Sequence, residues 1–159
     1  MREGKDIDLE GSLHQETEIE LHTSALIPED WLGDIHTRLT LYKRIASAAD
    51  QTTLRDLQVE MIDRFGLLPQ QTKHLFQIAE LRQKARSIGI SRIDFGETGG
   101  RMEFKEDTRA NPTALLEMIQ QQPFDYKLQG PHKLRLTFDE ESVEERIRIS
   151  NEILDRLAA

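Results

Sequence analysis

The first candidate for chemistry in this 159-residue sequence is a line of three carboxylates, Asp56, Glu60 and Asp63. In a helix, residues spaced i, i+4 and i+7 lie on one face, so these side chains form an acidic ridge opposite the apolar stripe of the same helix. Arg64 stands four residues after Glu60 and can pair with it, whereas the two aspartates have no cation at that spacing. Like charges in line favour an external cation, so the ridge is a candidate contact for a basic partner surface, and a solvated face is the alternative.

Other residues able to support catalysis show no spacing typical of a site. The cluster Gly96–Gly100 is followed by Arg101 rather than by the Lys-Ser/Thr of a phosphate loop, so we expect a hairpin turn there. No two histidines have the spacing that places two metal ligands on one helix face, and no serine lies in a Gly-x-Ser-x-Gly elbow. The sequence therefore predicts no catalytic residue, no metal site and no cofactor. The five histidines are His14, His22, His36, His74 and His132.

The composition restricts the class of partner. Twenty-nine acidic and 21 basic residues give a net charge of −8, which repels phosphate backbones and anionic membranes. The basic residues are interleaved with acids and form no run, so we expect no direct nucleic-acid partner and no membrane. The chain has no cysteine, which excludes disulfides and thiolate zinc sites. No window approaches the 18 or so apolar residues of a membrane span, and we expect a cytoplasmic protein.

The ridge must be held by a scaffold, and the apolar periods predict three helices between residues 34 and 88. A short strand at Glu18–Leu21 and a turn at Pro28–Leu32 precede them, and residues 1–16 read as a flexible linker to the domain at 17–159. We expect the second helix to begin near Thr53, in a capping box with Asp56. The predicted buried faces are Ile35, Leu39, Tyr42 and Ala46, then Leu54, Leu57, Met61, Ile62 and Phe65, then Leu75, Ile78, Ala79, Ala85 and Ile88.

After residue 88 the apolar pattern changes to that of strands. Alternating residues around Gly96–Gly100 predict one hairpin, and those around Gly130 and Pro131 predict a second. Between them a short helix begins at Asn111 and Pro112, and a last helix begins at a capping box of Ser142 with Glu145. The predicted class is α+β: a three-helix N-terminal part, then hairpin, helix, hairpin and helix, with a small, mostly antiparallel sheet covered by helices.

Four strings of the sequence resemble the C-terminal domain of bacterial transcription-repair coupling factors. The resemblance runs in the same order from about residue 17 to the end. The strings are Ser24-Ala-Leu-Ile-Pro-Glu-Asp30, Arg38-Leu-Thr-Leu-Tyr-Lys-Arg-Ile-Ala-Ser47, Met61-Ile-Asp-Arg-Phe-Gly-Leu-Leu-Pro69 and Gly99-Gly-Arg-Met-Glu-Phe104.

The resemblance implies that this chain is the last domain of a large ATP-dependent DNA translocase, with residues 1–16 leading from the motor. The ATPase and helicase motifs of that family have no counterpart here, so the resemblance implies no enzyme activity for this chain. It implies an autoinhibitory lid that docks on the N-terminal UvrA-recruiting module of the same protein until the motor engages stalled RNA polymerase. Tethering raises the effective concentration to the mM range, so weak contacts suffice. We expect Glu60 and Asp63 to make these contacts, with Asp56 on the flank.

Three other functions stay open at this point. A free-standing acidic regulatory protein that binds a basic partner surface is the first. A small hydrolase built from dispersed residues would need a pocket with a carboxylate or histidine of displaced pKa. Direct DNA binding would need a basic face.

Overall fold

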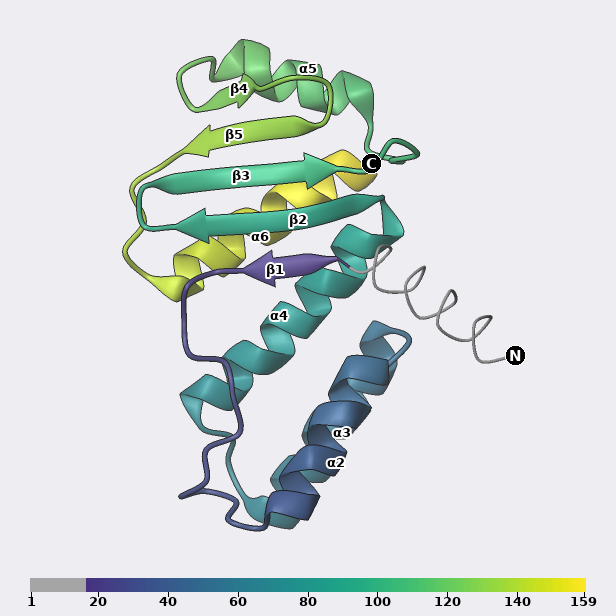
Figure 1. Cartoon of the computed structure of the whole chain (residues 1–159), viewed down its shortest axis with the longest axis vertical. Helices are drawn as coiled ribbons and strands as arrows, with labels where there is room; N and C mark the ends of the chain where they lie inside the picture. Colours follow the sequence, from purple (N-terminus) through teal and green to yellow (C-terminus); the bar gives the residue numbers. More distant parts are fainter. Residues whose placement is uncertain (1–16) are drawn as a thin grey trace, which may run out of the picture. The chain divides into compact units, whose positions relative to one another are not determined.

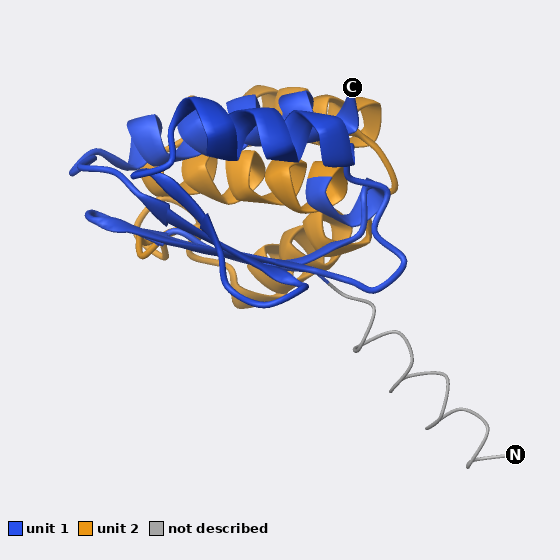
Figure 2. Cartoon of the chain, turned by 90° about the horizontal axis from the view of Figure 1, so that it is seen from above, with its two compact units in different colours: residues 1–21, 85–159 blue, residues 22–84 orange. Residues whose placement is uncertain are grey.

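The computed structural model describes residues 17–159, which form two compact units (Figures 1 and 2). Unit 2 is His22–Lys84, and unit 1 joins the described residues up to Leu21 with Ala85–Ala159. The predicted linker at 1–16 lies outside the described residues, and a single domain over 17–159 stays a prediction. No helix in the described part of the chain is long and apolar enough to cross a bilayer.

Unit 2 is built on helices α2 (Ile35–Ser47), α3 (Gln51–Phe65) and α4 (Gln70–Ser87), the last of which runs on into unit 1. This confirms the three-helix N-terminal part. Glutamine side chains fix the connection from α2 to α3: Gln83 Nε2 donates to the Ala48 carbonyl at 3.0 Å, and Gln51 Nε2 donates to Gln83 Oε1 at 2.7 Å. The start of α3 is therefore held in place by α4.

The buried face of α2 differs from the prediction. Ile35 and Leu39, predicted to be buried, are 56% and 51% exposed, while Leu41 and Ile45 are buried. Both sets recur at helical spacing, so periodicity alone does not choose between them. Packing decides, because Leu41, Ile45 and the Ala48 that follows α2 all belong to the core cluster of unit 2.

The start of α3 also differs from the prediction. Asp50 is the N-cap, and its carboxylate accepts from the backbone N–H and the hydroxyl of Thr53, both at 2.8 Å. The capping box predicted for Thr53 and Asp56 is therefore wrong, because a carboxylate three residues earlier satisfies the free N–H group. Leu54, Leu57 and Met61 are buried as expected.

Unit 1 contains a five-stranded sheet in the order β1-β2-β3-β5-β4. The β1–β2 pair is parallel and the other pairs are antiparallel, which confirms the mostly antiparallel sheet and the two hairpins. The strands are β1 (Glu18–Glu20), β2 (Ile90–Gly96), β3 (Gly99–Phe104), β4 (Tyr126–Leu128) and β5 (Lys133–Thr137). Gly100 permits the close approach of β2 and β3, since a Cβ there would lie 1.8 Å from the Asp94 carbonyl oxygen.

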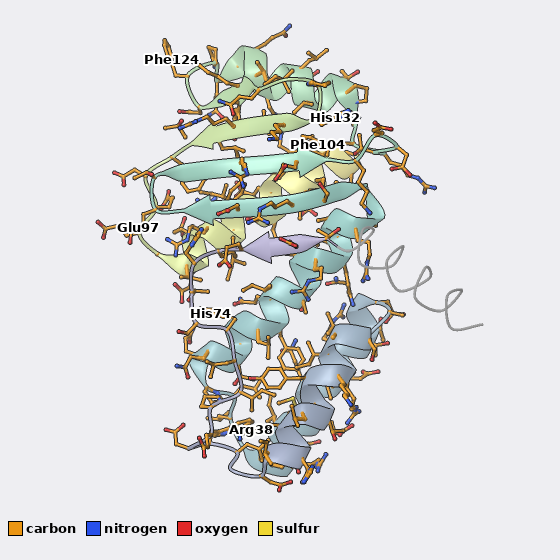
Figure 3. The ribbon with its side chains drawn as sticks, viewed as in Figure 1. Arg38, His74, Glu97, Phe104, Phe124 and His132 are labelled. Carbon is orange, nitrogen blue, oxygen red and sulfur yellow. The ribbon has the colours of Figure 1, made fainter. Side chains whose placement is uncertain are left out.

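Helices α5 (Pro112–Gln121) and α6 (Val143–Ala158) cover one face of this sheet (Figure 2). The caps predicted at Asn111 and Ser142 are confirmed, since Asn111 accepts from two backbone N–H groups and Ser142 from one. Phe124 precedes β4 and is 88% exposed (Figure 3). The buried residues beneath the sheet include Ile93, Phe95, Met102, Phe104, Met118, Leu134, Leu136, Ile147, Leu154 and Leu157.

Candidate interaction surface on helix α3

The burial of α3 determines which of its side chains reach solvent. Leu54, Leu57 and Met61 point into the core of unit 2, and Gly66 ends the helix with a positive φ of 97°. Asp56 and Asp63 lie on the exposed side, as the sequence predicted for the acidic ridge. Neither aspartate makes an ion pair or side-chain hydrogen bond with another residue in 17–159. Both carboxylates are therefore available to an external cation.

Two apolar residues lie between these aspartates on the surface of α3. Val59 is 57% exposed and Ile62 is 39% exposed. Val59 is three residues after Asp56 and four before Asp63, so the three side chains are neighbours on one helix face. Ile62 was predicted to be buried, which is wrong, because it lies about 100° around the helix from the buried Met61. The result is a small apolar patch bordered by free carboxylates, an arrangement typical of protein interfaces.

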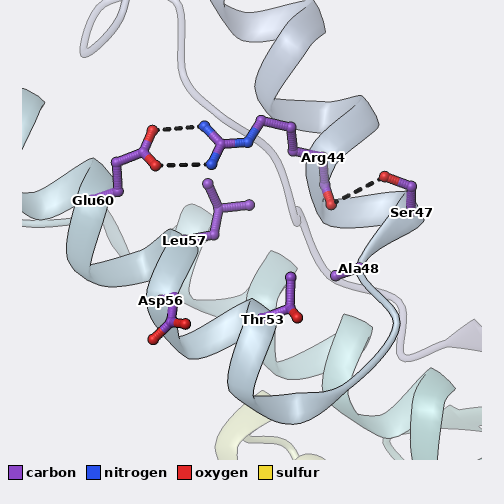
Figure 4. Close-up of a pocket in the computed structure, with 7 residues that line it drawn as sticks. All are labelled: Arg44, Ser47, Ala48, Thr53, Asp56, Leu57 and Glu60. Carbon is purple, nitrogen blue, oxygen red and sulfur yellow. Dashed lines mark hydrogen bonds and ion pairs between the residues drawn. The ribbon is translucent and has the colours of Figure 1, made fainter.

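Glu60 differs from the two aspartates because the protein already pairs it. Arg44 of α2 binds its carboxylate with both terminal nitrogens, at 2.6 and 2.8 Å (Figure 4). Arg64 adds a third contact at 3.3 Å, as the i, i+4 spacing predicted. Glu60 therefore joins α2 to α3, and the acidic ridge with its two arginines carries one net negative charge rather than three.

The arginines change the acidity of Glu60. Hydrogen bonds from Arg44 are the main cause that lowers the pKa of the Glu60 carboxyl to about 2, and partial desolvation opposes them. The same pair raises the pKa of Arg44. Glu60 is therefore ionised throughout the physiological range and is a weak base there.

A shallow pocket of about 280 Å³ lies between α2 and α3 beside this pair. Figure 4 shows Arg44 and Glu60 at one end, Leu57 beneath them, and Thr53 with Ser47 toward the other end. The carboxylate of Asp56 does not face the Arg44–Glu60 pair (Figure 4). The two hydroxyls that line the pocket are engaged within the fold: Thr53 Oγ1 donates to the N-cap carboxylate of Asp50 at 2.8 Å, and Ser47 Oγ donates to the Arg44 carbonyl at 3.5 Å.

The sequence did not reveal Arg44 as a member of this surface. Arg44 and Glu60 are 16 residues apart on different helices, and their meeting depends on how α2 is rotated against α3. Two apolar stripes on α2 have the same helical spacing, so the sequence does not determine that rotation. The exposure of Val59 and Ile62 is not encoded in their residue types either, because apolar side chains of this kind are more often buried.

Three other features of the chain bear on binding or catalysis. Trp31 packs on the core of unit 2, with its ring edge-on to Phe65 at a centroid distance of 5.9 Å. Among residues 17–159 no group of three or more histidine, aspartate and glutamate side chains is placed to hold a metal ion. His14 lies outside the described residues. The Gly96–Gly100 cluster forms the turn between β2 and β3, as predicted.

Comparison with known families identifies close sequence relatives. A family model described as the TRCF domain matches residues 21–115. A transcription-repair-coupling factor of Haemophilus influenzae is 41% identical over the whole chain, and that of Escherichia coli is 43% identical over 139 residues, or 87% of the chain. The chain spans only 14% and 12% of the length of these two relatives.

A solved structure also has this fold. The crystal structure of the C-terminal domain of a transcription-repair coupling factor matches with a TM-score of 0.71. The match covers 89% of this chain and 94% of that one, at 18% sequence identity. At that identity the likeness concerns the fold, and it agrees with the α+β arrangement of helices and sheet described above.

Proposed function

The chain belongs to the transcription-repair coupling factor (TRCF) domain family, and we propose that it is a non-catalytic regulatory domain that works by docking. Its docking site is the N-terminal UvrA-recruiting module of the same protein. In the docked state it masks the UvrA-binding surface, and it releases that surface when the motor engages stalled RNA polymerase.

The observation that carries this proposal is the surface of α3. Asp56 and Asp63 are exposed carboxylates without a partner in the described chain, and Val59 lies between them with 57% of its surface exposed. An apolar centre with a charged rim favours a protein partner whose own rim is basic. Glu60 contributes to the same surface while it stays bound to Arg44, since a carboxylate can accept further hydrogen bonds.

Weak contact is sufficient for a lid of this kind. The two chain segments are tethered in one molecule, so the effective concentration replaces much of the affinity that separate proteins would need. A surface with few free charges and a small apolar patch can then switch between docked and released states. Tighter docking would hinder the release on which the regulation depends.

A binding experiment tests the proposal directly. The labelled 159-residue chain is titrated with the purified N-terminal module of the same protein, and binding is followed by fluorescence anisotropy at low and physiological ionic strength. We expect saturable binding that weakens with salt, and at least about a tenfold loss of affinity for the double variant Asp56→Lys and Asp63→Lys. Added UvrA should compete with the chain for the module.

A matched control carries the same change of charge elsewhere. Glu106→Lys with Asp107→Lys alters two exposed acids in the loop after β3, outside unit 2. This control should bind the module as the unmodified chain does. Equal loss in both double variants would show that total charge rather than the α3 surface drives binding, and the docking proposal would then be abandoned.

A further inference from the structure

The outer face of the sheet in unit 1, opposite α5 and α6, carries two rows of charged side chains. The strand register places one row across all five strands and the other across four. In what we name the segregated row the acids come first and the bases follow. Its members are Glu20, Asp94, Arg101, Arg135 and Lys127. In the alternating row the charges change sign at each strand. Its members are Glu18, Arg92, Glu103 and Lys133.

The alternating row is compensated within the protein. Arg92 pairs with Glu18, and its Nε lies 3.9 Å from Glu103 Oε2. Lys133 Nζ lies 4.0 Å from Glu103 Oε1. Opposite charges that face each other across strands stabilise a sheet. The alternating row is therefore explained by the folded chain alone.

The three bases of the segregated row have no such explanation, whereas Asp94 of the same row is paired with Arg92 at 3.3 Å. Arg101 is directly opposite Arg135, and Arg135 is directly opposite Lys127. Arg101 Nε lies 3.4 Å from Glu103 Oε2, an acid of the alternating row. Neither Arg135 nor Lys127 makes an ion pair with another described residue. Like charges opposite each other destabilise a sheet. A sequence that breaks a local rule without a gain in the folded chain does so most often at a functional surface.

The charges of this row indicate the chemistry of its partner. Neighbouring strands are about 4.8 Å apart, so the three cations extend over about 10 Å and then give way to Asp94 and Glu20. A nucleic acid backbone is negative along its whole length and would run onto these two acids. The outer face of the described strands also lacks aromatic side chains, which single-stranded nucleic acids use for base stacking. A protein segment with an acidic block followed by a basic block matches both ends of the row.

We propose that the segregated row is a docking surface for such a protein segment. The acidic block binds Arg101, Arg135 and Lys127, and the basic block faces Asp94 and Glu20. The reversal of sign along the row fixes the direction of the bound segment, because the opposite orientation would place like charges together. The surface belongs to unit 1, so this proposal does not rest on the docking role of α3.

Two labelled peptides of identical composition test the proposal against the whole chain. One carries its acidic residues in a block followed by its basic residues, and the other alternates them. At low ionic strength we expect the block peptide to bind about tenfold more tightly than the alternating peptide, as measured by fluorescence anisotropy. No binding of either peptide, or equal binding of both, would overturn the proposal. A labelled single-stranded or duplex oligonucleotide that binds more tightly than the block peptide would overturn it in favour of a nucleic-acid surface.

Substitution of Arg135 separates docking from a structural role. Arg135→Glu should weaken binding of the block peptide by about tenfold, while the melting temperature stays the same or rises, because the new carboxylate faces Arg101 and Lys127. Arg55→Glu makes the same change of charge on α3 and should leave peptide binding unaltered. If Arg135→Glu lowers the melting temperature and leaves peptide binding unchanged, Arg135 has a structural role and the docking proposal is overturned. Equal loss of peptide binding in both variants would show that the net charge of the chain, rather than the position of Arg135, controls binding, and would also overturn the proposal.

Discussion

The acidic ridge of α3 and the outer face of the sheet are both charged surfaces, but the protein compensates them differently. In the ridge, Arg44 and Arg64 neutralise most of the charge around Glu60, and free carboxylates are left only at the flanks. On the sheet, the segregated row keeps three cations side by side. An ion pair within the chain can stabilise the folded state. A side chain that faces others of the same charge can instead bind an oppositely charged partner.

The two surfaces also rest on different cores. The ridge lies over Leu54, Leu57 and Met61 in unit 2, and the sheet face lies over buried residues of unit 1 such as Phe95. The core cluster of unit 2 includes Leu54, Leu57 and Met61 but not Phe95, so damage to one core should affect one surface first. This expectation can be tested by substitutions of graded severity.

The largest expected effect comes from Phe95→Ala. The side chain is fully buried and packs edge-on against Phe138 at 5.5 Å, so its removal should cost about 3–5 kcal/mol in free energy of unfolding. Urea unfolding measures this loss. Hydrogen exchange should show that amides of β2 and β3 lose more protection than amides of α3.

The matching change in the other unit is Leu57→Ala, which removes a buried leucine beneath the ridge and should cost about 2–5 kcal/mol. Here the amides of α3 should lose more protection than those of β2 and β3. An equal loss of protection in both units for both variants would mean that the chain unfolds as one cooperative body, and the two surfaces could not then be treated as independent.

The fold was readable from the sequence where local signals determine it. The α4 stripe of Ile78, Ala79 and Ala85 and the Asn111 and Ser142 caps depend on neighbours within a few residues, and all are as predicted. The face of α2 was not readable, because two apolar stripes compete and tertiary packing selects one.

The two surfaces show the same limit. Asp56, Glu60 and Asp63 are close in sequence, so their common helix could be found by spacing alone. Arg101, Arg135 and Lys127 are distant in sequence, and only the register of β3, β5 and β4 brings them together. A search for runs of basic residues cannot find such a patch, which is why the sequence suggested no cationic surface.

A smaller effect should separate the two rows of the sheet. Glu103→Gln removes the acid that lies near Arg92, Arg101 and Lys133, and we expect a loss of about 0.5–1 kcal/mol in free energy of unfolding. Arg135→Gln removes a cation from between two others and should be neutral or slightly stabilising. Urea unfolding at low ionic strength compares the two variants. Equal destabilisation would remove the distinction between the alternating and the segregated row.

The smallest expected effect concerns the pH dependence of the ridge. In the folded chain the pKa of Glu60 is about 2, below its ordinary value of 4.5. A lowered pKa means that the Arg44–Glu60 pair stabilises the fold fully above pH 4.5 and loses this contribution as the pH falls toward 2. Arg44→Gln should therefore be less stable than the unmodified chain at neutral pH, and the difference should disappear on acidification. Urea unfolding between these pH values measures the difference.

Arg64→Gln serves as the matched control for this last prediction, because Arg64 contacts the same carboxylate once, at 3.3 Å, rather than twice. Its pH-dependent difference should have the same sign and be smaller. A difference for Arg44→Gln that persists at pH 2 would show that the arginine acts through the packing of its aliphatic stem rather than through its charge. Glu60 would then carry its negative charge to the docking surface largely uncompensated, and the contrast between a neutralised ridge and an uncompensated sheet face would fail.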